Sequence, residues 1–300
     1  MENESHNTSF FYHQSVMTQE ILNSIDYCPH ISFKDFLGID ATLGGGGHSY
    51  QLLKKYHNLK IIGLDQDPDA RNASIANLKE FKNRITINAF NFADYIPEKK
   101  VSFVIADLGV NSNQLGNPER GFSFLKDGPL DMRMNPSLDI TAEKLLKQMS
   151  EKDLADLIYE YGDERLSRKI AHKIKKELRE KGNFSGTKAL AYSIAGCFPP
   201  KQRYRRIHPA TRTFQALRIA VNREIDVLKK LLDNAPNWLM PGGIITIISF
   251  HSIEDRLVKN HFRKDIRLIP ITKKPLTPSA SEILKNKRSR SAKLRIAQIK

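Results

Sequence analysis

The sequence is poor in cysteine and has no long apolar run. Its two cysteines, Cys28 and Cys197, lie far apart and lack Cys-x-x-Cys spacing, which argues against a disulfide framework or a zinc site and is typical of a reducing cytoplasm. No run approaches the roughly 18 apolar residues that a membrane span requires. The first ten residues are polar and lack arginine, unlike a secretory signal or a mitochondrial transit peptide. We therefore expect a cytoplasmic protein that does not bind membranes.

Acidic residues are fewer than basic ones, and the excess of basic residues is unevenly distributed along the chain. The chain has 48 Lys and Arg against 33 Asp and Glu, a net charge of +15. Residues 165–212 hold 14 basic against 2 acidic residues, and residues 257–300 hold 13 against 2, so the rest of the chain is net negative. Two concentrated basic segments favour a polyphosphate partner such as nucleic acid, with binding that weakens in salt. The alternative is that they are solvated helix faces and a basic tail.

Apolar strands alternate with helices in the first third of the chain. The pattern predicts, in chain order, a strand at 36–43, a helix at 48–57, a strand at 60–65, a helix from Pro68, and strands at 85–90 and 101–106. Buried strands that alternate with helices indicate a parallel sheet with both faces covered, which is an α/β fold. In such a sheet, ligands bind at the carboxyl ends of the strands.

The middle of the chain has a different pattern. Residues 109–136 form a long loop rich in glycine, asparagine and proline, and helical periodicity dominates residues 141–233. Because no strand is evident there, we predict that residues 110–208 are a mostly helical domain inserted into an α/β domain made of residues 1–109 and 209–300. The later elements are predicted to be one long helix from Pro209 to Leu232, a strand at 244–250, a helix at 252–264, and strands at 267–272 and 293–299.

A glycine-rich turn follows the first strand. The spacing acid-x-Thr-x-Gly-x-Gly, which begins at Asp40, is close to the acid-x-Gly-x-Gly-x-Gly of methyltransferases that use S-adenosylmethionine (AdoMet). Ser49 stands where a dinucleotide motif has its last glycine, and no Gly-Lys-Ser/Thr of a P-loop occurs. Asp65 ends the second strand 19 residues past Gly46, where an acid binds ribose hydroxyls. The alternative is a tight turn without a ligand.

Asp107 closes the fourth strand and is our candidate catalytic residue. Methyltransferases that act on exocyclic amines often have an acid, Asn or Ser here, followed by Pro-Pro-aromatic; Asp107-Leu-Gly-Val keeps only the acid. Such an amine is a poor nucleophile because its lone pair is delocalised into the ring. A carboxylate that accepts its hydrogens shifts the lone pair toward nitrogen. The alternative is a cap or an ion pair at a strand end.

Eight sequence blocks, taken together, resemble the bacterial 16S rRNA cytosine-N4 methyltransferase family (RsmH, also called MraW). The blocks begin at His13, Asp40, Asp65, Asp107, Glu119, Tyr161, Pro209 and Ser249. The resemblance covers nearly the whole chain. It implies a class I AdoMet-dependent methyltransferase domain, which is Rossmann-like, with an inserted mostly helical domain that recognises the substrate. It further implies methyl transfer to N4 of one cytidine in the decoding region, with small-subunit rRNA or the 30S particle as partner.

The resemblance also implies the cofactor contacts, position by position. They fall on Gly46, Gly47, His48, Asp65, Phe92, Asp107 and Gln114. The glycines would admit the methionine part of AdoMet, the acid after the second strand would bind ribose, and the phenylalanine would stack near adenine. The candidates for contact with RNA are Arg120, Asp131, Arg133, Arg203, Arg205, Arg206 and His251.

Some of these residues have a second interpretation. His251 follows a strand and acts as a proton acceptor, an RNA contact or a helix cap. Phe122 and Phe124 stack on an unpaired base, or they fill the joint between domains. No metal is expected, because the methyl group of AdoMet is already activated. The sequence leaves a monomer and a homodimer open.

Three rival functions also stay open. The first is an AdoMet-dependent methyltransferase that acts on another rRNA base, a protein or a small molecule. The second is a nicotinamide oxidoreductase, which the missing third glycine disfavours. The third is a non-catalytic RNA-binding factor in ribosome assembly.

Overall fold

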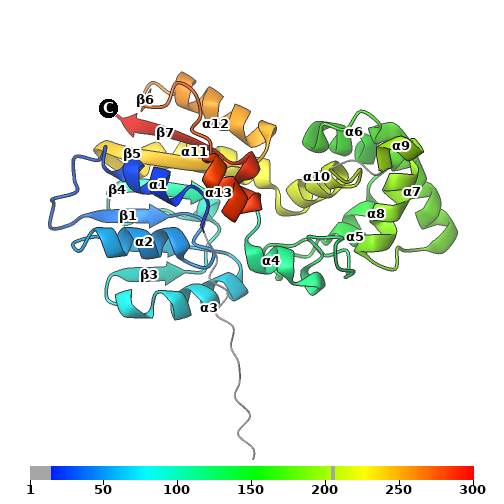
Figure 1. Cartoon of the computed structure of the whole chain (residues 1–300), viewed down its shortest axis with the longest axis horizontal. Helices are drawn as coiled ribbons and strands as arrows, with labels where there is room; N and C mark the ends of the chain where they lie inside the picture. The colour runs from blue at the N-terminus through cyan, green and yellow to red at the C-terminus, as the bar shows by residue number, and fades with distance from the viewer. Residues whose placement is uncertain (1–14, 204–206) are drawn as a thin grey trace, which may run out of the picture.

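The alternating pattern at the two ends of the chain produces one seven-stranded sheet in the computed structural model, which describes residues 15–203 and 207–300 (Figure 1). Its strands are β1 (Leu37–Asp40), β2 (Lys60–Leu64), β3 (Ile85–Asn88), β4 (Val101–Asp107), β5 (Leu239–Ser249), β6 (Leu268–Pro270) and β7 (Lys293–Ile299). They lie in the order β3-β2-β1-β4-β5-β7-β6. The predicted parallel sheet is confirmed for β1 to β5, whereas β7 is antiparallel to both β5 and β6.

Helices cover both faces of this sheet. They are α1 (Thr18–Ile25), α2 (Gly47–Lys55), α3 (Pro68–Asn77), α11 (Glu224–Trp238), α12 (Ser252–Lys264) and α13 (Ala280–Lys285), with the short 3-10 helices η1 (Lys79–Phe81), η2 (Phe92–Asp94) and η4 (Lys287–Ser291). Successive residues of a strand point to opposite faces. Phe103 and Ile105 of β4 therefore pack with α1 and α2, while Val104 and Ala106 pack with α11 and α12.

The middle of the chain folds into a second, helical lobe beside the carboxyl ends of the strands (Figure 1). Its helices are α4 (Ser112–Gly116), η3 (Pro118–Arg120), α5 (Ala142–Gln148), α6 (Glu151–Gly162), α7 (Ser167–Lys181), α8 (Thr187–Gly196), α9 (Pro200–Arg203) and α10 (Thr211–Asn222). They have a hydrophobic cluster of their own, to which α10 contributes Phe214, Leu217 and Val221. The division of the chain at residues 110–208 stays a prediction, but the packing of α10 ties it to the helical lobe.

The prediction of one long helix from Pro209 to Leu232 is wrong. The chain breaks at Arg223, which has a left-handed φ of 51° and separates α10 from α11. Apolar side chains before the break pack in the helical lobe, and those after it pack against the sheet. Apolar residues recur at helical spacing through both segments, so periodicity alone does not reveal the break.

Other differences are small. The segment between the last two predicted strands contains α13 and η4. α6 ends at Gly162, and the left-handed residue that follows it is Asp163, with φ 50°. Across the described ranges, no helix is both long enough and apolar enough to cross a membrane.

The register of β1 against β4 makes a testable prediction. A Cβ on Gly38 would lie 2.0 Å from Cζ of Phe103. Because such overpacking typically costs about 1–3 kcal/mol, we expect Gly38→Ala to lower the free energy of unfolding by about 2 kcal/mol in urea denaturation. The control is Gly196→Ala in α8, where a Cβ meets no atom within 4 Å. Equal unfolding midpoints for Gly38→Ala and the native chain would contradict this register.

Candidate active site

A cavity of about 390 Å³ opens at the carboxyl ends of the parallel strands. It is lined by residues that follow or end five neighbouring strands, among them Phe92 after β3, Asp65 after β2, His48 after β1, Asp107 at the end of β4 and Phe250 after β5. Because these five strands are neighbours in the sheet, the cavity extends along the carboxyl ends of the strands from β3 to β5. Ligands of open α/β sheets bind at this edge.

The glycine turn brings the start of α2 to the cavity. Gly44 and Gly46 have φ angles of 53° and 79°, which strain a residue with a side chain. Gly47 and His48 begin α2 and line the cavity at the partial positive charge of the helix N-terminus. A Cβ on Gly46 would lie 2.7 Å from Cδ1 of Leu78, so Gly46 packs closely against that side chain. Gly46 therefore shapes the turn, and its contact with a cofactor stays a prediction.

Buried hydrogen bonds hold this turn from behind. Oδ2 of Asp40 accepts a hydrogen bond of 2.7 Å from Oγ of Ser49, and Oδ1 accepts one of 3.3 Å from the backbone N–H of Thr42. Oγ1 of Thr42 in turn accepts one of 2.6 Å from the backbone N–H of Asp107. The first of the three strand-end acids thus supports the turn and links it to β4.

Asp65 already accepts two backbone hydrogen bonds. Its Oδ2 accepts from the N–H of Gly44 and its Oδ1 from the N–H of Asp67, both at 2.8 Å. Burial raises the pKa of Asp65 to about 6, although the two N–H groups oppose the rise. Each carboxylate oxygen can accept a further hydrogen bond, and Asp65 lines the cavity. It therefore has acceptor capacity at the cavity, and its contact with ribose hydroxyls stays a prediction.

His48 and Asp107 carry the clearest sign of a polar ligand. Nε2 of His48 lies 3.4 Å from Oδ2 of Asp107. Burial opposes a charge on His48, but the neighbouring carboxylates, Asp107 first, outweigh it and raise the pKa of His48. Both ring nitrogens of His48 and Oδ1 of Asp107 are buried without a hydrogen-bond partner in the described part of the chain. Such atoms are costly to leave unpaired, so they fit a ligand with polar groups, such as the amino-acid end of AdoMet.

Two phenylalanines line the cavity where β3 ends. Phe92, the predicted adenine contact, does so while it packs against the core of the sheet. Phe90 lines the cavity as well and is 47% exposed. Sequence reasoning missed Phe90, although two phenylalanines spaced two apart after a strand were a visible signal. An exposed aromatic ring at a cavity suits stacking on a flat ring such as adenine.

Gln114 also lines the cavity, but both ends of its amide are paired. Its Nε2 donates to Oδ2 of Asp67 at 2.7 Å, and its Oε1 accepts from the N–H of Asn111 at 3.0 Å. Asp67 also accepts from Nη1 of Arg120 at 2.9 Å. Gln114 therefore joins α4 to the start of α3, and its contact with the cofactor stays a prediction.

The arginines of the 119–134 block are engaged within the protein. Nη2 of Arg120 donates to the carbonyl oxygens of Arg133 and Met134 at 3.0 and 2.9 Å. Arg133 pairs with Asp131 through hydrogen bonds of 2.8 and 2.7 Å. These contacts order the loop beside the cavity. Binding of RNA by Arg120, Asp131 or Arg133 stays a prediction.

The two loop phenylalanines are packed, but within the helical lobe and not at the joint between domains that the sequence predicted. Phe122 is buried in the helical cluster, and Phe124 packs against it. The ring centroid of Phe124 lies 4.8 Å from that of Phe214 and 4.7 Å from that of His208. These two rings fill the helical lobe.

Of the predicted RNA contacts Arg203, Arg205 and Arg206, only Arg203 lies within the described residues. Arg203 is exposed at the end of α9, where its Nε donates to the carbonyl of Phe198 at 2.9 Å. Arg203 does not line the cavity. Arg205 and Arg206 lie outside the described residues.

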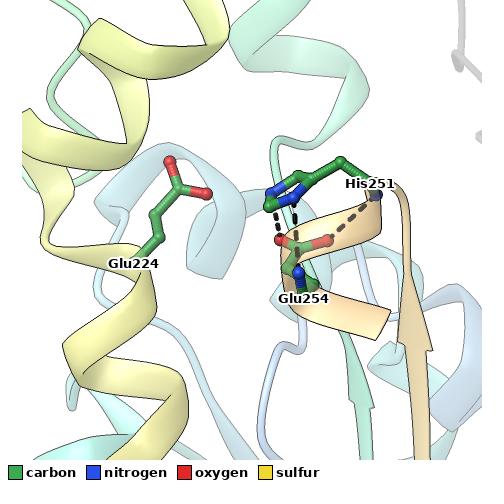
Figure 2. A group of neighbouring side chains, drawn as sticks. All are labelled: Glu224, His251 and Glu254. Atoms are coloured by element: carbon green, nitrogen blue, oxygen red, sulfur yellow. Dashed lines mark hydrogen bonds and ion pairs between the residues drawn. The ribbon is translucent and has the colours of Figure 1, made fainter. Parts of the chain in front are cut away.

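His251 is a helix cap, as one interpretation of the sequence held. It precedes α12, and its Nδ1 accepts from the N–H of Glu254 at 3.4 Å, while its Nε2 lies 3.0 Å from Oε1 of Glu254. Figure 2 shows the carboxylate of Glu224 pointing toward this pair from α11. The ligand atoms of the three side chains lie within 4.8 Å of one another, close enough for a metal ion. Their hydrogen bonds and ion pairs account for the cluster without a metal, and the absence of a metal stays a prediction.

Sequence reasoning missed three cavity residues at the break between α10 and α11. Arg218 and Glu224 pair across the break at 2.8 and 2.9 Å. Nδ2 of Asn222 donates to the carbonyl of Met132 at 2.8 Å, and its Oδ1 accepts from the N–H of Met134 at 2.7 Å. Through Asn222, the break between α10 and α11 therefore fixes the loop that contains Met132 and Met134 beside the cavity. Arg218 ends one of the eight sequence blocks, which was the available signal.

The strand order, the glycine turn and the acids after β1, β2 and β4 define a class I AdoMet-dependent methyltransferase. AdoMet is its cofactor, and the unpaired atoms of the cavity wall suit that molecule. The chain belongs to the MraW methylase family, which it matches over residues 10–300.

Bacterial relatives are similar over all or nearly all of their length. A protein of Prochlorococcus marinus subsp. pastoris named ribosomal RNA small subunit methyltransferase H is 69% identical over 300 residues, which is 100% of both chains. A Synechococcus protein of the same name is 58% identical and covers 97% of this chain and 95% of its own. The crystal structure of an rRNA methylase from Streptococcus thermophilus covers 95% of this chain and 97% of its own, at 8% identity and a TM-score of 0.44, and we draw no conclusion from that likeness.

The raised pKa of Asp65 predicts a pH dependence of cofactor binding. The ionised carboxylate accepts more hydrogen bonds than the protonated one, and its pKa lies at about 6. By linkage, one such group makes the Kd for AdoMet rise about tenfold between pH 7 and pH 5. Isothermal titration calorimetry measures the Kd at each pH.

The variant Asp65→Asn is the comparison, because it cannot titrate. This variant retains His48, the other titrating group of this wall. The pH dependence of AdoMet binding that remains in Asp65→Asn is therefore the contribution of His48. The affinity of Asp65→Asn for AdoMet should be lower than native at pH 8 and approach the native value at pH 5. A ratio of the two Kd values that does not change with pH would contradict this role of Asp65.

Proposed function

We propose that the protein transfers a methyl group from AdoMet to N4 of the cytidine at position 1402 of 16S rRNA. The full-length relatives, which carry the name ribosomal RNA small subunit methyltransferase H, support small-subunit rRNA as the substrate. The choice of N4 and of this cytidine comes from the family resemblance of the sequence. The observation that carries the chemistry is the buried, unpaired Oδ1 of Asp107 on the cavity wall.

The chain's own residues position the reaction. AdoMet supplies an activated methyl group when it is bound. Oδ2 of Asp107 faces His48, so Oδ1 is the atom that accepts a hydrogen from the cytosine amine. Thr42 fixes the backbone of Asp107 and hence the direction of its side chain. The target base must leave its stack to reach the cavity, because the amine is inaccessible inside a helix.

The two basic segments support an RNA substrate. The described residues of the segment 165–212 include α7, α8 and α9 of the helical lobe and the start of α10, and residues 257–300 include α13 and η4. η4 contributes Arg288 and Ser291 to the cavity wall, so the second segment reaches the site itself. We propose that residues 110–208, together with α10, form the unit that recognises the RNA, in a cytoplasmic protein that acts on rRNA or the 30S particle.

The role of Asp107 makes the central kinetic prediction. Asp107→Ala should lower the single-turnover rate of methyl transfer to small-subunit particles by about 100-fold or more, because it removes the acceptor for the amine hydrogen. The Kd for RNA should change by less than about threefold, since phosphate contacts dominate that affinity. Transfer from methyl-labelled AdoMet at saturating concentration measures the first, and filter binding measures the second.

The matched control is Asp156→Ala, an exposed aspartate on α6 away from the cavity, which should behave as the native protein. Equal losses of RNA affinity and transfer rate in Asp107→Ala would contradict the role of Asp107. Label on any nucleoside other than N4-methylcytidine would contradict the choice of base. RNA binding without any consumption of AdoMet by the native protein would favour a non-catalytic assembly factor.

A further inference from the structure

The cavity has a charged end that the cofactor assignment does not use. The predicted AdoMet contacts follow β1 to β4, whereas Arg218, Glu224, Phe250 and Glu254 line the cavity from the α10–α11 break and from the end of β5. A Cβ on Gly109 would lie 3.8 Å from the ring of Phe250. Phe250 therefore lies beside the residues that follow β4, the strand that ends at Asp107. The charged end is therefore the part of the cavity left for the base that receives the methyl group.

Resting on the proposed function, we propose that Arg218, held in place by Glu224, recognises the N3 and O2 edge of the target cytosine. The carboxylate of Glu224 binds Nε and Nη2 of Arg218 in the fork geometry, at 2.8 and 2.9 Å. A guanidinium has five N–H donors and no acceptor, and this pair uses two of the five. The hydrogen bonds that Arg218 donates within residues 15–203 and 207–300 come from Nε and Nη2, and Arg218 lines the cavity, so Nη1 is the donor left for the base.

The burial of the ion pair between Arg218 and Glu224 is not explained by the stability of the fold alone. The side chain of Arg218 is 17% exposed, and that of Glu224 is 10% exposed. Desolvation of two charges offsets much of their attraction, so a buried ion pair is weak support for a fold. Arg223, between the two, adopts a left-handed φ of 51°, and this bend lets both side chains face the same cavity. Backbone strain of this kind is common at ligand sites.

The donor pattern selects cytosine over uracil. Cytosine presents a donor at N4 and acceptors at N3 and O2, whereas uracil presents an acceptor at its position 4 and a donor at N3. Asp107 accepts and Arg218 donates, so cytosine matches both. Uracil would place its O4 against a carboxylate and its N3–H against a guanidinium, which leaves buried groups unpaired. Phe250 supplies an aromatic ring to the same wall, suited to stacking on the base.

Glu254 and His251 hold each other at the start of α12. Oε2 of Glu254 accepts from the backbone N–H of Phe250 at 2.8 Å and of His251 at 3.4 Å, and Oε1 lies 3.0 Å from Nε2 of His251. Nε2 makes this ion pair but no hydrogen bond within the described residues. Both side chains lie next to Glu224 (Figure 2). Among these groups, Arg218 is the one that combines a fixed positive charge with donors left for a ligand.

The test compares cytidine with 3-deazacytidine, which keeps the N4 amine but has no N3 acceptor. Small-subunit RNA is assembled by ligation with either nucleoside at the target position, and kcat/KM is measured for each. The native protein should prefer cytidine by about 10–100-fold, the range expected for one good polar contact with a base. In Arg218→Lys, which keeps the charge beside Glu224 but loses the planar fork, the preference should fall below about threefold.

Two further variants separate recognition from folding. Arg218→Gln combined with Glu224→Gln removes both charges together, and it should also lose the preference. Lys229→Gln, at an exposed lysine of α11 that does not line the cavity, should keep the native preference. The Kd for AdoMet and the melting temperature of Arg218→Lys should stay close to native, since the residue lies at the acceptor end.

The outcomes distinguish this inference from the proposed function. If the native protein does not methylate cytidine at N4, the proposed function fails, and this inference fails with it. If the native protein methylates cytidine but Arg218→Lys keeps the full preference over 3-deazacytidine, only the inference is overturned. A loss of AdoMet affinity in Arg218→Lys equal to its loss of kcat/KM would also overturn it, because Arg218 would then belong to the cofactor site.

Discussion

The site depends on one constraint: the atoms that meet a ligand must be buried and yet unpaired until the ligand arrives. Oδ1 of Asp107 and Nδ1 of His48 meet this description. Each such atom costs about 1–3 kcal/mol when it is left without a partner. The surrounding structure therefore has to hold the two side chains in place, and the bonds of Asp40, Thr42 and Asp65 to the turn do so.

Hydrogen bonds and an ion pair made by a small number of side chains attach the helical lobe to the same cavity. Asn222 binds the backbone of Met132 and Met134, and Arg120 binds the backbone of the same loop while it pairs with Asp67 at the start of α3. The loop between the lobes is thereby fixed to the sheet. Because the break between α10 and α11 carries both the hydrogen bonds of Asn222 and the Arg218 pair, the helical lobe and the charged end of the cavity are structurally connected.

Local patterns predicted the sheet well and the polar contacts poorly. Apolar runs that end in acids predicted the strands, the glycine turn and the positions of Asp65 and Asp107 at strand ends. In the structure both acids line the same cavity. The break at Arg223 was not predictable, because helical periodicity continues through it. The internal pairing of Arg120 was not predictable either, since its partners lie far away in the sequence or on the backbone. Charge alone suggested phosphate contacts for it, and the fold uses its donors inside the protein.

The proposed chemistry requires that the cavity present the N4 amine of a cytosine to the cofactor. Nucleoside mass spectrometry of small-subunit rRNA, from cells with and without this gene, measures the product of that chemistry. N4-methylated cytidine should be present in the first sample and lost in the second, with the loss restored by the native gene. An unchanged amount of N4-methylated cytidine in the absence of the gene would show that the protein does not catalyse this transfer.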